Sequence, residues 1–249
     1  MSALKDYTER YESVTFERSD NGVLTMRLHT ADGPLVWGTT PHRELPEAFA
    51  DVAADRETRV VLLTGTGDRF CADRDDTLSA LRSSPEGWDR IYWEGKRLLS
   101  NLLDIEVPVV AAVNGPALYH AELALLSDVV LAADTTSFQD RPHFPSGVVP
   151  GDGVQVVWQK LLGTNRGRYF LMTGQELSAK DALDLGLVGE VLPGDQVLGR
   201  ARQLADSFAE RSTLTLRYTR VAMVGHIKRA LAEELGYGLA LEGLALQAR

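Results

Sequence analysis

Residues 13–29 alternate between apolar and polar side chains, with one interruption at Asp20-Asn21-Gly22. A period of two is typical of β-strands, and an Asn-Gly pair favours the tight turn between two antiparallel strands. From Pro41 onward the apolar positions follow helical spacing instead. The pattern therefore predicts an opening β-hairpin followed by a helix.

Three short runs are apolar on both faces of an extended chain: residues 60–65, 107–115 and 128–133. The intervening segment 86–106 has apolar residues at helical spacing, and 121–127 is a short helix candidate directly after a strand. Strands that are apolar on both faces are usually covered by helices on each side, as in sheets built from successive strand–helix units. We therefore predict an α/β fold.

Almost the whole chain after Gly153 shows helical spacing. Three of these segments, 154–163, 166–174 and 179–186, end in glycine, which is a common helix terminator. The C-terminal residues form a pattern of two or three helices, with Arg and Glu on one side and Leu, Ala and Val on the other. We predict a core domain over residues 1–195 and a helical C-terminal region over residues 196–249 that takes part in contacts between subunits.

Composition and charge narrow the possible partners. The 249 residues include 26 Lys and Arg against 35 Asp and Glu, a formal net charge of -9, which disfavours nonspecific binding to nucleic acid or anionic membranes. Cys71 is the single cysteine, so an intramolecular disulfide and a multi-cysteine metal site are excluded. The charged N-terminus lacks a secretory core, and no run reaches the roughly 20 apolar residues of a membrane span. We expect a cytoplasmic protein.

The common motifs for nucleotides and nucleophilic serines do not explain the chain. Gly65-Thr66-Gly67 follows a predicted strand, but Phe70 stands where a dinucleotide loop carries its third glycine. Ser146 lies near other candidate residues without the G-x-S-x-G turn of a nucleophilic serine. We therefore expect no cofactor and no metal.

Two histidines stand in positions that suggest a binding site. His120 and His143 each follow the carboxyl end of an apolar strand or strand-like segment, where α/β proteins place ligand sites. A hydrogen-bonded loop histidine is the alternative for both. The remaining histidines, His29, His42 and His226, are interpreted as surface or packing residues.

The segment 141–155 crowds proline and glycine around His143 and Asp152 and can bring these two side chains into contact. A carboxylate that orients an imidazole produces a general base, because the anion selects the tautomer and stabilises the imidazolium. Asp152 could instead be the N-cap of the helix predicted from residue 154. The two roles are compatible, since a carboxylate has two oxygens.

Three further residues have both a functional and a structural interpretation. Trp37, flanked by turn residues, could line a pocket or be a core aromatic. Glu242 lies in an apolar run and could face solvent or be directed into a pocket. Glu122 lies two residues after His120, so on a regular helix the two side chains would diverge by roughly 200°, and we expect them to point apart.

The order of several segments along the chain resembles that of a known family. Segments 60–76, 107–118, 121–138 and 144–153 resemble the core signature of the crotonase (enoyl-CoA hydratase/isomerase) superfamily. The resemblance implies a crotonase-type spiral of repeated ββα units with a helical C-terminal region, and a homotrimer or a dimer of trimers. It also implies an oxyanion hole of two backbone N–H groups, one after FCADRD and one near the turn after NGPAL.

Departures from the acyl-CoA enzymes argue against hydration of an enoyl-CoA. Residues 118–121 replace a glycine-rich turn, and His143 stands where hydratases carry a second catalytic glutamate, so Glu122 lacks that partner. The pattern resembles instead the branch of 6-oxocamphor-type β-diketone hydrolases, which cleave a carbon–carbon bond in cyclic β-diketones without coenzyme A. The resemblance gives as catalytic residues His143, Asp152, His120 and Glu242, and as a substrate-binding residue Trp37. We add Glu122, which matches the first hydratase glutamate, and Arg74, which departs from the branch, as further substrate-binding candidates.

The implied reaction is a retro-Claisen cleavage of a small cyclic diketone. His143, oriented by Asp152, would activate water, while His120 or backbone groups stabilise the oxyanion. Trp37 would donate its indole N–H to the other carbonyl, and Glu242 would support the polar network. The alternatives are an acyl-CoA hydratase, isomerase or thioester hydrolase that uses Glu122, and a scaffold or binding subunit without activity.

Overall fold

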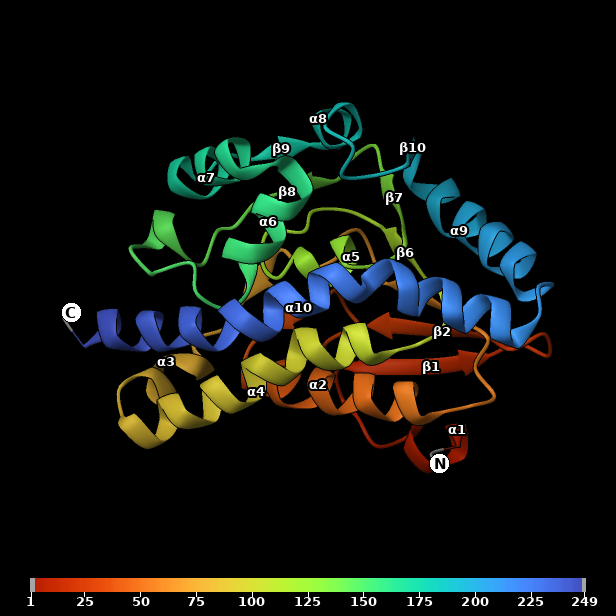
Figure 1. Ribbon diagram of the computed structural model, residues 1–249, viewed down its shortest axis with the longest axis horizontal. Coiled ribbons are helices and arrows are strands. Elements are labelled where there is room, and N and C mark those ends of the chain that lie inside the picture. The colour runs from red at the N-terminus through yellow and green to blue at the C-terminus, as the bar shows by residue number, and fades with distance from the viewer. Residues whose placement is uncertain (1–2, 248–249) are drawn as a thin grey trace.

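A six-stranded sheet with the order β1-β2-β4-β6-β7-β10 forms the centre of the computed structural model, which describes residues 3–247 (Figure 1). The predicted hairpin is confirmed: β1 and β2 pair antiparallel, with Val14 opposite Leu28. The three predicted buried strands are confirmed as β4, β6 and β7, and every pairing from β2 to β10 is parallel. The six strands are β1 (Val14–Arg18), β2 (Val23–Leu28), β4 (Val60–Thr64), β6 (Val109–Val113), β7 (Val129–Ala133) and β10 (Glu190–Leu192).

Short second strands repeat along the chain and form the spiral. Strand β3 (Val36–Trp37) pairs parallel with β5 (Asp73–Arg74), and β8 (Ser137–Phe138) pairs antiparallel with β9 (Leu177–Ser178). Ala117 links the two pairs through parallel bridges to Cys71 and Phe138. Strands β2, β4, β6 and β7 are each followed by a short strand or bridge and then a helix, which confirms repeated ββα turns. These strands of two residues are too short for a periodic pattern to reveal.

Helices cover both faces of the sheet, as the doubly apolar strands predict. Val61 and Leu63 of β4 pack on the side of α2 (Thr39–Ala54) and α4 (Pro85–Asp104), because alternate residues of a strand point to opposite faces. Val60 and Leu62 face α9 (Gly194–Ala209) and contact the cluster that contains Val197 and Ala201. The sheet is therefore enclosed between two helical layers.

The prediction of two or three C-terminal helices is confirmed, because the chain ends in α9 and one long helix, α10 (Thr213–Leu246). Helix α10 runs alongside α4 (Figure 1). A Cβ at Gly238 would lie 2.4 Å from the carbonyl oxygen of Gly151, and one at Gly243 would lie 2.1 Å from the indole nitrogen of Trp88. These glycines permit close packing within a continuous helix and do not terminate it. The other helices are α1 (Leu4–Tyr7), α3 (Thr77–Arg82), α5 (Glu122–Leu125), α6 (Val154–Leu162), α7 (Thr164–Thr173), α8 (Ala179–Asp184) and the 3-10 turn Phe144–Ser146.

The predicted division at residues 195 and 196 falls inside α9, whose apolar face packs on the sheet. Helix α10 leaves several large apolar side chains exposed, which is the kind of surface that a subunit contact covers. They are Leu214, Tyr218, Val221, Met223, Tyr237, Leu241 and Leu244. The trimeric assembly and the role of residues 196–249 in it stay predictions. Within residues 3–247, no helix has the length and apolar character needed to cross a bilayer.

Candidate active site

One pocket gathers residues from several parts of the chain, including Ile91, Gly95 and Leu98 of α4. It lies where β3, α2, the β5–α3 segment, the loop before α5, the loops between β8 and α6, and α10 approach one another. Six of the seven residues expected from the sequence line it: Trp37, Arg74, His120, His143, Asp152 and Glu242. The seventh, Glu122, lies behind His120 and is 1% exposed.

His143 lies between two carboxylates, only one of which the sequence suggested. Its Nδ1 is 2.6 Å from Oδ1 of Asp140, and its Nε2 is 3.3 Å from Oδ2 of Asp152. Asp140 was not predicted, although it lies three residues before His143. Gly153, rather than Asp152, is the N-cap of α6, and Asp152 accepts only a long bond of 3.5 Å from the N–H of Val154.

This arrangement determines the charge of His143. A neutral imidazole has one N–H, so it cannot donate to carboxylates at both nitrogens, whereas an imidazolium can. Burial lowers the pKa of His143, but the charges of Asp152 and Asp140 outweigh burial and raise the pKa well above its ordinary value. Burial likewise raises the pKa of Asp152, and the charge of His143 outweighs it and lowers that pKa. The pair is therefore ionised at neutral pH.

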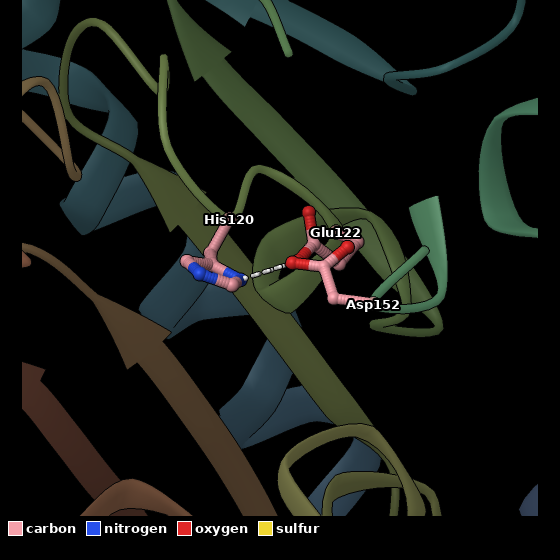
Figure 2. Close-up of side chains that lie close together, drawn as sticks. All are labelled: His120, Glu122 and Asp152. Atoms are coloured by element: carbon pink, nitrogen blue, oxygen red, sulfur yellow. Dashed lines mark hydrogen bonds and ion pairs between the residues drawn. The ribbon is translucent and has the colours of Figure 1, made fainter. Parts of the chain in front are cut away.

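His120, Glu122 and Asp152 point toward one another (Figure 2). The Nδ1 of His120 is 2.7 Å from Oε1 of Glu122 and 3.8 Å from Oδ2 of Asp152. The expectation that His120 and Glu122 point apart is wrong, because His120 precedes α5 and has a left-handed φ of 48°, which turns its ring back toward Glu122. The ligand atoms of these three residues lie within 4.8 Å of one another, so this group could also hold a divalent cation.

His120 and Glu122 both have a raised affinity for protons. Burial lowers the pKa of His120, but the neighbouring Glu122 and Asp152 outweigh it and raise the pKa above its ordinary value. Burial raises the pKa of Glu122, partly opposed by the charge of His120. Both groups therefore hold a proton more tightly than they would in water, which makes the His120 ring a hydrogen-bond donor.

Trp37 lies against the His120 ring. The two ring centroids are 3.8 Å apart with an interplanar angle of 37°. Pairing of Trp37 with Arg74 across β3 and β5 fixes the backbone, and the carbonyl of Trp37 accepts the N–H of Asp75 at 2.9 Å. Trp37 lines the pocket, and within residues 3–247 its indole N–H has no hydrogen-bond partner.

His42 belongs to the pocket, contrary to its interpretation as a surface or packing residue. It is buried, its Nδ1 is 2.7 Å from Oε2 of Glu94, and Glu94 also accepts from Arg90 at 2.8 Å. Burial lowers the pKa of His42 against the opposing effect of Glu94, so the ring is neutral and its Nε2 is an acceptor. Its position on the apolar stripe of α2, three residues before Leu45 and seven before Phe49, was the signal that could have placed it inward.

Glu242 is directed into the pocket and not toward solvent. It is 3% exposed, and its Oε2 lies 4.0 Å from Nε2 of His143. That oxygen is buried without a hydrogen-bond partner among the described residues. Burial raises the pKa of Glu242 to about 7. A carboxylate that titrates near neutral pH thus lies beside an imidazolium.

The backbone near the turn after NGPAL is already engaged within the fold. The N–H groups of Leu118 and Tyr119 both donate to the carbonyl oxygen of Cys71, at 2.8 and 3.1 Å. These two groups are therefore not free to bind a substrate oxygen in the way the resemblance implies. The side chains of Trp37 and His120 supply donors in the pocket instead.

Comparisons with known proteins agree with this fold. Residues 19–241 match the family model described as enoyl-CoA hydratase/isomerase. A β-diketone hydrolase from the cyanobacterium Anabaena sp. PCC 7120, solved bound to (S)-3-oxocyclohexyl acetic acid, is 49% identical with a TM-score of 0.95, and the match covers 98% of this chain and 97% of that one.

Other relatives carry names of coenzyme A enzymes. An enoyl-CoA hydratase/isomerase structure from Mycobacterium paratuberculosis is 26% identical with a TM-score of 0.88, covering 96% of this chain and 95% of that one. Carnitinyl-CoA dehydratase from Proteus mirabilis is 34% identical over 89% of this chain and 84% of its own length. Because the family match spans most of the sequence and the ββα spiral is present, the chain belongs to the crotonase (enoyl-CoA hydratase/isomerase) superfamily.

Proposed function

We propose that this chain hydrolyses a carbon–carbon bond in a small cyclic β-diketone, a retro-Claisen reaction that uses neither coenzyme A nor another cofactor. The observation that carries the proposal is the unpartnered carboxylate oxygen of Glu242 beside the His143 imidazolium in the pocket. The Anabaena relative, a β-diketone hydrolase at 49% identity, supports the same reaction class.

The compound bound to that relative has the chemical form of a product. Oxocyclohexyl acetic acid carries one ketone and one carboxylic acid. Hydrolysis of a β-diketone converts one ketone into a carboxylic acid and leaves the other unchanged, and a keto acid of this form results when one ring of a bicyclic β-diketone opens. We infer a bicyclic diketone as the substrate class and a cyclic keto acid as the product.

Glu242 is the group best suited to take a proton from water. A general base works best when its pKa is near the operating pH, and burial raises the pKa of Glu242 to about 7. The sequence favours His143 for this role, but His143 faces carboxylates at both nitrogens and already carries a proton. We therefore assign the base to Glu242 and a proton-donor role to His143, which Asp140 and Asp152 hold in place.

The remaining steps follow from the donors in the pocket. Water loses its proton to Glu242 and its oxygen bonds to one carbonyl carbon, which gives a tetrahedral alkoxide. Trp37 and His120 donate hydrogen bonds to the carbonyl oxygens, and donors of this kind contribute roughly 10²–10³ in rate each. The alkoxide collapses, the carbon–carbon bond breaks, and its electron pair forms the enolate of the second carbonyl. His143 donates the proton that the enolate carbon needs.

The acyl-CoA alternative depends on Glu122. That carboxylate is bonded to His120 and is not among the residues that line the pocket. A thioester enzyme would need it exposed to the acyl chain, so its position favours the diketone. Arg74, which lines the pocket from β5, is proposed to contact the substrate.

Incubation of the purified protein with cyclic β-diketones and, separately, with enoyl-CoA and acyl-CoA thioesters tests the proposed function. We expect diketones to be converted to keto acids without added cofactor, thioesters to remain unchanged, and free coenzyme A to leave the melting temperature where it was. Turnover of thioesters alone would establish the acyl-CoA alternative. Turnover of neither class would favour a scaffold or binding subunit without activity.

The rate is expected to depend on pH through Glu242. Its carboxyl must be ionised to accept a proton, so kcat/KM for a diketone should rise with pH and level off above about 7. We expect kcat/KM to fall again only at a pH where His143 loses its proton, and the pKa of His143 lies well above that of an ordinary imidazole. A pH profile measures both limbs, and a rate that decreases steadily from about pH 5.5 to pH 8 would be incompatible with this assignment.

A further inference from the structure

The pocket contains a guanidinium group that the proposed mechanism does not use. Arg82 is the last residue of α3 and lines the pocket together with Leu78, which lies four residues earlier on the same helix face. Its Nε is buried and has no hydrogen-bond partner among residues 3–247, and the side chain forms no ion pair there. A buried donor on a charged group destabilises the protein when it is left unpaired. Arg82 is thus a cationic donor without a protein acceptor.

Arg82 and Glu242, the proposed base, line the same pocket. Its positive charge is close enough to Glu242 to act on that carboxyl, where it lowers the Glu242 pKa against the larger effect of burial. The carbonyl carbon attacked by water becomes the carboxyl carbon of the product. A new carboxylate therefore forms beside Glu242, and so within the surroundings of Arg82.

We propose that Arg82 binds the carboxylate of the keto acid that carbon–carbon cleavage releases. The inference rests on the proposed function, which supplies the acid. The planar fork of a guanidinium matches the two oxygens of a carboxylate, whereas a neutral diketone offers it no charge. After cleavage the carboxylic acid loses its proton to solvent, and the resulting anion replaces the missing partner of Arg82. Arg82 accordingly distinguishes product from substrate and makes the enzyme sensitive to inhibition by its product.

The test compares a charged ligand with a neutral ligand that has the same carbon skeleton apart from one methyl group. Binding of 3-oxocyclohexyl acetic acid and of its neutral methyl ester is measured by calorimetry on the wild-type protein and on Arg82→Gln. Since a hydrogen bond to a charged group contributes about 1.5–3 kcal/mol, the acid should bind roughly 10- to 100-fold more weakly to the variant. The ester should bind with the same affinity to both proteins. Arg82→Lys, which keeps the charge without the planar fork, should lie between them and also serves if Arg82→Gln does not fold.

The matched control is Arg168→Gln, which removes the same charge from an exposed position on α7 outside the pocket. Arg168→Gln should change neither the affinity for the acid nor the affinity for the ester. Equal affinity of the wild type and Arg82→Gln for the acid, equal losses for acid and ester, or no binding of the acid to the wild type would each overturn the inference. Failure of the proposed function is recognised separately, because the wild-type protein would then consume no diketone whatever its affinity for the acid.

Discussion

Replacement of Glu242 with Gln is expected to lower kcat for a cyclic β-diketone by about 100- to 1,000-fold. Glutamine keeps the size of the side chain and removes its ability to accept a proton from water. Because Glu242 is buried beside His143, bulk solvent has no easy access to replace it as a base. Steady-state kinetics at pH 8 measures the loss, and the rising acid limb of the pH profile should disappear with it.

The same substitution is expected to stabilise the protein at high pH. The pKa of Glu242 is raised from 4.5 to about 7 on folding, so the folded state favours the neutral form and loses stability as pH rises from about 4.5 to about 7. Glutamine stays neutral, so the variant should be more stable than the wild type by on the order of 1–3 kcal/mol at pH 8, and the gap should shrink toward pH 5. Urea unfolding at the two pH values measures this difference.

Glu233→Gln is the matched control, since Glu233 is exposed on the same helix. It should leave both kcat and stability unchanged within error. A Glu242→Gln enzyme with near wild-type kcat would remove Glu242 from the role of base. A variant that lost both activity and stability at pH 8 would instead indicate a structural role for the ionised carboxylate.

Replacement of Trp37 with Phe is expected to lower kcat/KM by about 100-fold or more. Phenylalanine keeps an aromatic ring against His120 but lacks the N–H that is proposed to bind a carbonyl oxygen. Removal of one oxyanion donor costs roughly 10²–10³ in rate, and this donor lies in a pocket closed by side chains from several elements. The loss should fall mainly on kcat, because the negative charge on oxygen develops only in the transition state.

Trp93→Phe provides the control for that experiment. Trp93 is 47% exposed on α4 and lies under the guanidinium of Arg97, outside the pocket. It should retain full activity. If Trp37→Phe also retained it, the indole N–H would have no part in stabilising the oxyanion, and His120 would be left as the principal donor.

The sheet could be predicted from the sequence because its strands are continuous apolar runs, and their two faces are buried under different helices. Strand β10 was missed, since three residues of intermediate burial in a helical region carry no periodic signal. Helix α10 continues through several glycines, although glycine is a common helix terminator. Gly238 and Gly243 lie instead where another element approaches too closely for a Cβ, and only the packed structure reveals this.

The site was predictable in part. Trp37, His120, His143, Asp152 and Glu242 were named from loop positions and from the family resemblance, and all of them line one pocket. The sequence could not reveal which of these side chains contact one another. Asp140 is hydrogen-bonded to Nδ1 of His143, and the left-handed backbone of His120 brings the His120 ring to Glu122. Such contacts depend on the backbone dihedral angles of loops, which the hydrophobic pattern of the sequence does not reveal. The contacts in turn determine which groups carry protons.

The most direct test of the proposed reaction is oxygen tracing. The purified protein is incubated with a bicyclic β-diketone in water labelled with oxygen-18, without coenzyme A, and the product is analysed by mass spectrometry. Hydrolytic cleavage predicts a keto acid in which the carboxylate carries one solvent-derived oxygen beyond the exchange seen in a no-enzyme control. Unchanged diketone, together with hydration of an enoyl-CoA by the same preparation, would contradict it.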